Sequence, residues 1–89
     1  MNITKSISII LNKIPQDVFE EEFLEDLNNQ SLVLNLLNEL SIVKKTLEQQ
    51  PDYSDDKNYI SIVNPIYNNL TDCYLSFFNL VDNQTEFIN

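Results

Sequence analysis

Apolar residues recur at the spacing of an α-helix along most of the chain. At 3.6 residues per turn, positions three or four apart line one face of a helix. The first such face is formed by Ile3, Ile7, Ile10, Leu11 and Ile14. We therefore expect a helix over residues 4–13. Because Ser6 and Ser8 alternate with β-branched isoleucines, a short strand through Ile7 and Ile9 is the alternative.

A second helix is predicted over residues 15–28. Pro15 suits the first turn of a helix, and Asp17 and Glu20 follow where the positive end of the helix dipole favours carboxylates. The expected buried stripe consists of Phe19, Phe23, Leu24 and Leu27, with Val18 beside it. The opposite face carries Glu21, Glu22, Glu25 and Asp26. Such opposed faces are typical of an amphipathic helix.

The strongest helical pattern begins after Ser31, a candidate N-cap for a third helix. Heptad-like spacing is held by Val33, Leu36, Leu37, Leu40, Val43 and Leu47, and the apolar face is widened by Leu32, Leu34 and Ile42. Lys44 and Lys45 lie near the C-terminal end, as the helix dipole favours. We expect this helix at the centre of a bundle.

Residues 48–54, which include Pro51 and Tyr53, form the clearest predicted loop, and Ser54 is a candidate N-cap for the final helical stretch. The same apolar spacing then returns at Tyr59, Ile62, Val63, Ile66, Leu70, Cys73, Tyr74, Phe77 and Val81. Pro65 interrupts this pattern. Either it kinks one long helix, or Asn64 caps a new helix and residues 55–63 form a short separate turn. Residues 84–89 are expected to fray, with Phe87 and Ile88 folding back onto the bundle as the alternative.

These patterns predict an all-α fold. Short connections make neighbouring helices antiparallel, so we expect a compact antiparallel bundle of four helices, or five if Pro65 separates two. At 89 residues the chain is expected to form a single acidic helical-bundle domain over residues 1–89.

The net charge of the chain restricts the kinds of partner that it can bind. Fourteen acidic residues against five Lys give a net charge of −9, which repels phosphate backbones and anionic membrane surfaces. Direct nucleic-acid binding is therefore disfavoured, no run is long enough for a membrane span, and a basic protein surface is the natural complement. The one cysteine rules out an intrachain disulfide and permits a reducing compartment, so we expect a cytoplasmic protein.

The residue types that are missing argue against catalysis. Without His there is no Ser-His-Asp or Cys-His arrangement, and without Gly there is no phosphate-cradling loop. The carboxylates lack EF-hand spacing, and Cys73 falls in an apolar register that is typical of an inert, buried thiol. We expect no enzyme activity, no cofactor and no metal.

The acidic residues of 17–26 are candidates for partner binding, together with Asp52, Asp55 and Asp56, with which they would form one negative face. A solvated helix face is the alternative interpretation. Tyr53 and Tyr67 are added because tyrosine is over-represented at binding hot spots. The candidate partner-binding residues are therefore Glu21, Glu22, Glu25, Asp52, Tyr53, Asp55, Asp56 and Tyr67.

For an acidic helical protein without catalytic residues, we expect the role of a stoichiometric inhibitor or immunity protein, which masks a basic surface of a toxin or nucleic-acid enzyme. A phage-encoded inhibitor gives the same pattern, and a homodimeric structural or adaptor protein is the alternative. In size, acidity and helical content the chain resembles bacteriocin immunity proteins, including the four-helix nuclease-immunity kind. The stretches Lys5-Ser6-Ile7-Ser8 and Ile62-Val63-Asn64 are similar to segments of those proteins. Their Tyr-Tyr-Pro contact motif has no counterpart here, so none of their site residues is carried over.

Overall fold

The computed structural model describes residues 3–88, with side chains up to residue 79. Within this range the chain forms three α-helices and two 3-10 helices, and it contains no strand. The elements are α1 (Ile3–Lys13), η1 (Phe23–Glu25), α2 (Leu27–Glu48), η2 (Asp55–Tyr59) and α3 (Ile60–Ile88). The all-α class is confirmed, and the strand alternative for the first element is wrong. A bundle of four or five α-helices is not what the described chain forms.

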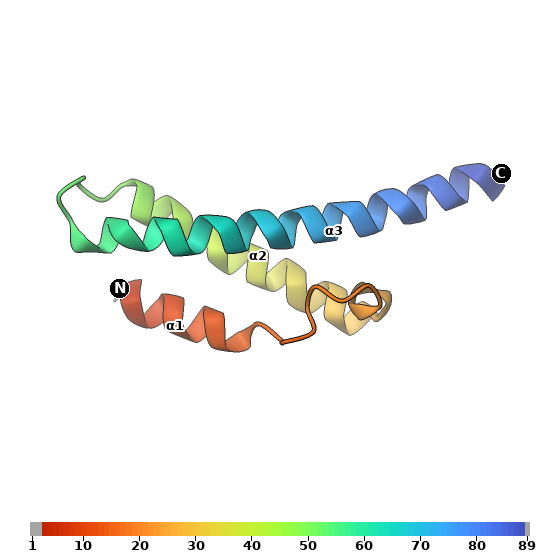
Figure 1. Ribbon diagram of the computed structural model, residues 1–89, viewed down its shortest axis with the longest axis horizontal. Helices are drawn as coiled ribbons and strands as arrows, with labels where there is room; N and C mark the ends of the chain where they lie inside the picture. Colours follow the sequence, from red (N-terminus) through yellow and green to blue (C-terminus); the bar gives the residue numbers. More distant parts are fainter. Residues whose placement is uncertain (1–2, 89) are drawn as a thin grey trace.

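The helix α2 lies between α1 and α3 and packs against both, and successive helices run in opposite directions (Figure 1). The molecule is elongated, with extents of 54 × 21 × 17 Å. Its radius of gyration is 15.4 Å, whereas about 12 Å is expected for a compact domain of this length. The predicted compactness is therefore wrong, because α3 runs on past the N-terminal end of α2 (Figure 1).

The apolar stripes of the three helices meet in one core. The buried residues of the helices are Ile3, Ile7 and Ile10 of α1, Val33, Leu36, Leu40, Val43 and Leu47 of α2, and Val63 and Leu70 of α3. Leu40 and Leu47 of α2 are completely shielded from solvent. The prediction that this helix is central is confirmed, because both other helices bury their stripes against it.

The largest departure from expectation is residues 14–26, which we call the acidic segment. Instead of an α-helix it forms a series of turns that ends in the 3-10 helix η1, and Val18 N–H donates to the carbonyl of Pro15 (3.3 Å) and Phe23 N–H to that of Glu20 (3.1 Å). The segment buries three apolar residues, Val18, Phe23 and Leu24. Phe19, at 53% exposure, and Leu27 of α2, at 75%, lie outside the core, so the predicted stripe is wrong for these two.

Two physical reasons oppose a helix in the acidic segment. Carboxylates would repel one another at i, i+4 spacing in the pairs Asp17–Glu21, Glu21–Glu25 and Glu22–Asp26, without a Lys to offset them. In a helix with about 100° per residue, Val18 would also point about 140° away from Phe23 and about 120° away from Leu24. Turns let Val18 reach the same core as Phe23 and Leu24.

The start of α2 holds the end of the acidic segment in place. Asp26 has extended backbone (ψ 127°), and its carboxylate accepts a hydrogen bond from Asn28 N–H at 2.8 Å. The side-chain amides of Asn29 and Gln30 donate to the carbonyls of Phe23 (2.9 Å) and Leu24 (2.8 Å). The N-cap of this helix is thus Asp26, and the prediction of Ser31 is wrong.

The second connection agrees more closely with the sequence pattern. Ser54 Oγ accepts a hydrogen bond from Asp56 N–H (3.3 Å), as its predicted capping role requires, although the element it caps is the 3-10 helix η2. α3 then begins at Ile60 and continues through Pro65 as one helix, so Asn64 does not cap a new one. The helix extends over residues 84–88, where the sequence predicts fraying. Asn89 lies outside the described part of the structure, and so does the side chain of Val81, which the pattern predicts in the buried stripe.

Candidate functional site

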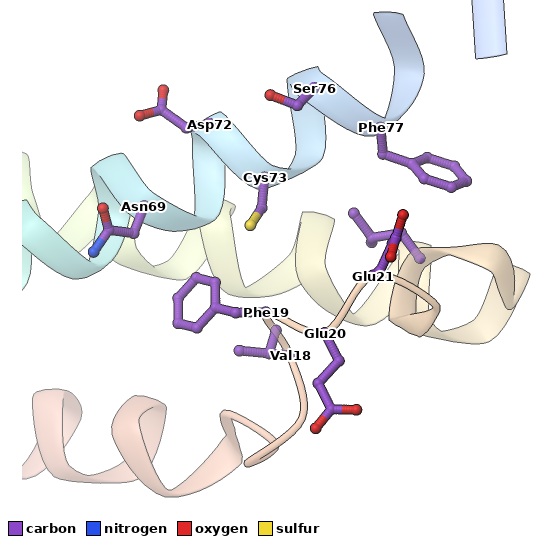
Figure 2. A pocket seen from close by; sticks show the side chains of 10 residues that line it. Val18, Phe19, Glu20, Glu21, Asn69, Asp72, Cys73, Ser76 and Phe77 are labelled. Carbon is purple, nitrogen blue, oxygen red and sulfur yellow. The ribbon is translucent and has the colours of Figure 1, made fainter. Parts of the chain in front are cut away.

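An open groove of about 540 Å³ lies between the acidic segment and the middle of α3 (Figure 2). The acidic segment supplies Val18, Phe19, Glu20, Glu21 and Leu24, and α3 supplies Asn69, Asp72, Cys73, Ser76 and Phe77. The α3 residues recur at intervals of three and four, so they share one helix face. The groove exists because α3 extends over the turns of the acidic segment.

The middle of the groove is apolar. Val18 and Leu24 are buried residues that line it, and Cys73 directs its sulfur from α3 toward Phe19 and Val18 (Figure 2). The ring of Phe77 lies at one end. Phe19 is about half exposed, so an apolar side chain placed here would find uncovered aromatic surface.

The rims of the groove are acidic on both sides. Glu20 and Glu21 come from the acidic segment and Asp72 from α3, and all three are exposed. Figure 2 shows the carboxylates of Glu20 and Asp72 directed away from the apolar middle. No Lys is among the lining residues that the structure describes. The acidic segment contains six carboxylates and no Lys, so it carries −6 of the net charge of −9.

An aromatic cluster supports the α3 wall. The ring centroids of Tyr74 and Phe78 are 4.7 Å apart, and Phe77 meets Phe78 edge to face at 5.3 Å and 85°. Aromatic rings at these separations attract one another in addition to the area they bury. The contact restrains the Phe77 ring at the end of the groove.

The structure separates the predicted acidic face into two regions. Glu21 lines the groove, and Glu22 and Glu25 are exposed on the same segment. The second acidic group, with Asp52, lies at the other end of α2 (Figure 1). At 1.5 Å per residue, the 22 residues of α2 hold the two regions about 33 Å apart. The prediction of one continuous negative face is therefore wrong.

The residues of the second acidic region have partners of their own. Asp52 pairs with Lys57 Nζ at 3.0 Å, and the same ammonium donates to the carbonyl of Gln50 (3.4 Å). Asp55 and Asp56 occupy the first turn of η2, where the N-terminal end of a helix favours negative charge. Tyr53 projects into solvent at 91% exposure. This region is less negative than the acidic segment.

Tyr67 is held within the molecule. Its ring packs, half buried, against the core, and Lys44 Nζ lies 5.2 Å from the ring centroid as a cation–π contact. Tyr67 is a candidate partner-binding residue only because tyrosine is over-represented at binding hot spots. Tyr67 does not line the groove, because the part of α3 that forms its wall begins at Asn69.

Three groove residues have roles that the sequence pattern does not indicate. The pattern predicts Phe19 and Cys73 in buried stripes, yet Phe19 is half exposed and Cys73 is half buried with its sulfur facing the groove. Nothing in the pattern singles out Asp72. The available signal was the run of like charges around Phe19, which opposes the helix that would have buried this ring.

The groove offers apolar contact surface and negative charge. Among the residues that the structure describes, no group of three or more Asp, Glu, Cys or His could hold a metal ion. None of the helices, over the same residues, is long and apolar enough to cross a membrane. Comparison with protein-family models, curated proteins and solved structures gives no match to this chain.

Proposed function

We propose that this chain is a non-catalytic binding protein that captures a basic partner protein and masks its surface. The partner meets the acidic segment and the groove beside it. A stoichiometric inhibitor or immunity protein for a cytoplasmic toxin or nucleic-acid enzyme, encoded by a bacterium or its phage, is the role that this chemistry suits. One observation carries the proposal: the segment with −6 of the net charge borders an open apolar groove.

Charge and apolar contact contribute differently to such binding. Uncompensated carboxylates on exposed turns accelerate encounter with a positive partner and disfavour anionic competitors. This attraction weakens as salt screens the charges, over a Debye length of about 8 Å at physiological ionic strength. Apolar burial in the groove is insensitive to this screening and slows dissociation. We therefore expect the association rate to fall steeply with salt.

The test reverses charge at one end of the molecule. Changing Glu21, Glu22 and Glu25 to Lys should abolish capture of the partner, because these exposed carboxylates would become repulsive. Helical circular dichroism should remain nearly unchanged, since the acidic segment contains no α-helix. The measurement is quantitative pull-down from the native host, with the captured protein identified by mass spectrometry.

A matched control makes the same change of charge at the other end. Glu48, Asp52 and Asp55 are also exposed, and their replacement by Lys should leave most capture intact. If both triple variants lose capture equally, net charge is sufficient and the acidic segment has no special role. Undiminished capture by the first variant contradicts the proposal.

A homodimeric adaptor is the second candidate, and a different surface favours it. Ile9 and Ile42 are exposed beside a shallow groove of about 220 Å³ between α1 and α2. Charge there is balanced by the ion pair between Lys13 and Glu39 (3.1 Å). If this surface joins two copies, the mass in solution should rise with concentration and Ile42→Lys should prevent the rise. Sedimentation velocity measures both.

A further inference from the structure

We infer that the groove binds a cationic amphipathic helix of the partner, with an apolar side chain between Phe19 and Phe77 and Lys or Arg side chains at the two acidic rims. This inference rests on the proposed function and specifies the element that is recognised.

The walls of the groove favour a helix over an extended peptide. The α3 wall has its backbone groups in helical hydrogen bonds, and the turns of the acidic segment use the N–H groups of Val18, Glu20 and Phe23. The carbonyls of Phe23 and Leu24 are occupied by side-chain amides of α2. An extended peptide needs backbone partners, which the sheet edges of other proteins supply, whereas a helix satisfies its own backbone and presents only side chains.

The distribution of charge specifies a helix with cations on both flanks of a narrow apolar stripe. Glu20 and Glu21 border one side of the groove and Asp72 the other, with apolar side chains between them. Lys and Arg can lay their methylene groups on apolar surface while the charged end reaches outward. A ligand of this kind places its cations next to both rims while its apolar stripe covers Phe19.

The size of the groove limits how much of the ligand enters. Its volume of about 540 Å³ is within the range of about 300 to 1,000 Å³ that is typical of small-ligand pockets. A few side chains fit, but a folded surface does not. The helix therefore rests across the groove and inserts its apolar residues.

A second copy of this chain is a poor occupant. Its cationic helix is α1, with Lys5 and Lys13, but the apolar face of α1 is buried against α2. Two copies that each carry a net charge of −9 also repel each other. The occupant is thus a helix from another protein.

Cys73 allows occupancy to be measured, since it is the one cysteine of the chain and it lines the groove. The probe is a synthetic Lys/Leu peptide of about five helical turns with all Leu on one face. The control peptide has the same composition in scrambled order. N-ethylmaleimide is the thiol reagent, because it is uncharged and the acidic rims do not repel it. With free amphipathic peptide at about five times its Kd, alkylation of Cys73 should slow about sixfold.

Substitutions test where the amphipathic peptide binds without relying on alkylation of Cys73. Phe19→Ser removes an exposed aromatic wall of the groove, and Ile62→Ser removes an exposed apolar side chain near the start of α3, outside the groove. Fluorescence anisotropy of the labelled amphipathic peptide should show about tenfold weaker binding to the first variant, equivalent to about 1.4 kcal/mol. The second variant should bind like the unchanged protein.

The outcomes separate this inference from the proposed function. If both peptides bind equally and Cys73 stays reactive, cations meet the acidic surface without entering the groove, and only the helix inference is overturned. The inference also fails if neither peptide binds at low salt. The proposed function itself fails when the variant with Glu21, Glu22 and Glu25 changed to Lys still captures the partner.

Discussion

The helix α2 and the acidic segment before it are consecutive in the chain, but they bury apolar side chains in different ways. α2 buries five residues, from Val33 to Leu47, along one continuous helical face. The acidic segment buries Val18, Phe23 and Leu24 through successive turns and leaves Phe19 half exposed. One region builds the core, and the other combines part of the core with one wall of an open groove.

Their charges account for much of this difference. α2 contains Glu39 and Glu48 together with Lys44 and Lys45, so its net charge is zero, whereas the acidic segment has six carboxylates and no Lys. Each like-charge pair at i, i+4 opposes a helix by about 0.2 to 0.5 kcal/mol. The charge density on which the proposed basic partner depends therefore also disfavours the helix that the apolar pattern of the acidic segment indicates.

The largest expected loss of stability comes from a substitution on the buried face of α2. Leu40 is fully buried, so Leu40→Ala should lower the free energy of unfolding by about 2 to 5 kcal/mol. Urea unfolding followed by circular dichroism at 222 nm measures the change. Leu34→Ala, at an exposed position of the same helix, is the control and should lose less than about 1 kcal/mol. Equal losses would show that α2 does not organise the core.

A substitution at the boundary between the acidic segment and α2 should destabilise the protein less than Leu40→Ala does. Asp26→Ala removes the carboxylate that caps α2 and should lower the free energy of unfolding by about 0.5 to 2 kcal/mol. Ser31→Ala is the comparison, because Ser31 lies inside the helix and alanine is the better helix former. If Ser31→Ala lowers the free energy of unfolding more than Asp26→Ala does, the helix begins at Ser31, as the sequence pattern predicts.

The smallest effect is expected at Leu27, which shares its residue type with Leu40 but not its burial. At 75% exposure, Leu27→Ala should change the free energy of unfolding by no more than about 0.5 kcal/mol. The same urea titration provides the measurement. A loss close to that of Leu40→Ala would mean that Leu27 is buried, as in the amphipathic helix that the sequence pattern indicates.

The proposed binding region was only partly predictable from sequence. The acidic pattern indicates Glu21, which lines the groove, but the opposite wall comes from Asp72 and Cys73 of α3, which are distant along the chain. Local pattern does not indicate which distant helix covers a segment. Tyr67 shows the same limit, since its contact with Lys44 depends on how α2 and α3 pack.

The sequence by itself determined the all-helical class, the apolar faces of α1, α2 and α3, the capping role of Ser54 and the net charge of −9. These features depend on residue type and on the 3.6-residue period, which are local properties. Only the tertiary structure decided that residues 14–26 form turns and that the two acidic regions lie at opposite ends of α2. Both outcomes depend on which residues become neighbours in space. Val18, Phe23 and Leu24 reach one core only when the segment is not α-helical, and the length of α2 separates the two acidic regions.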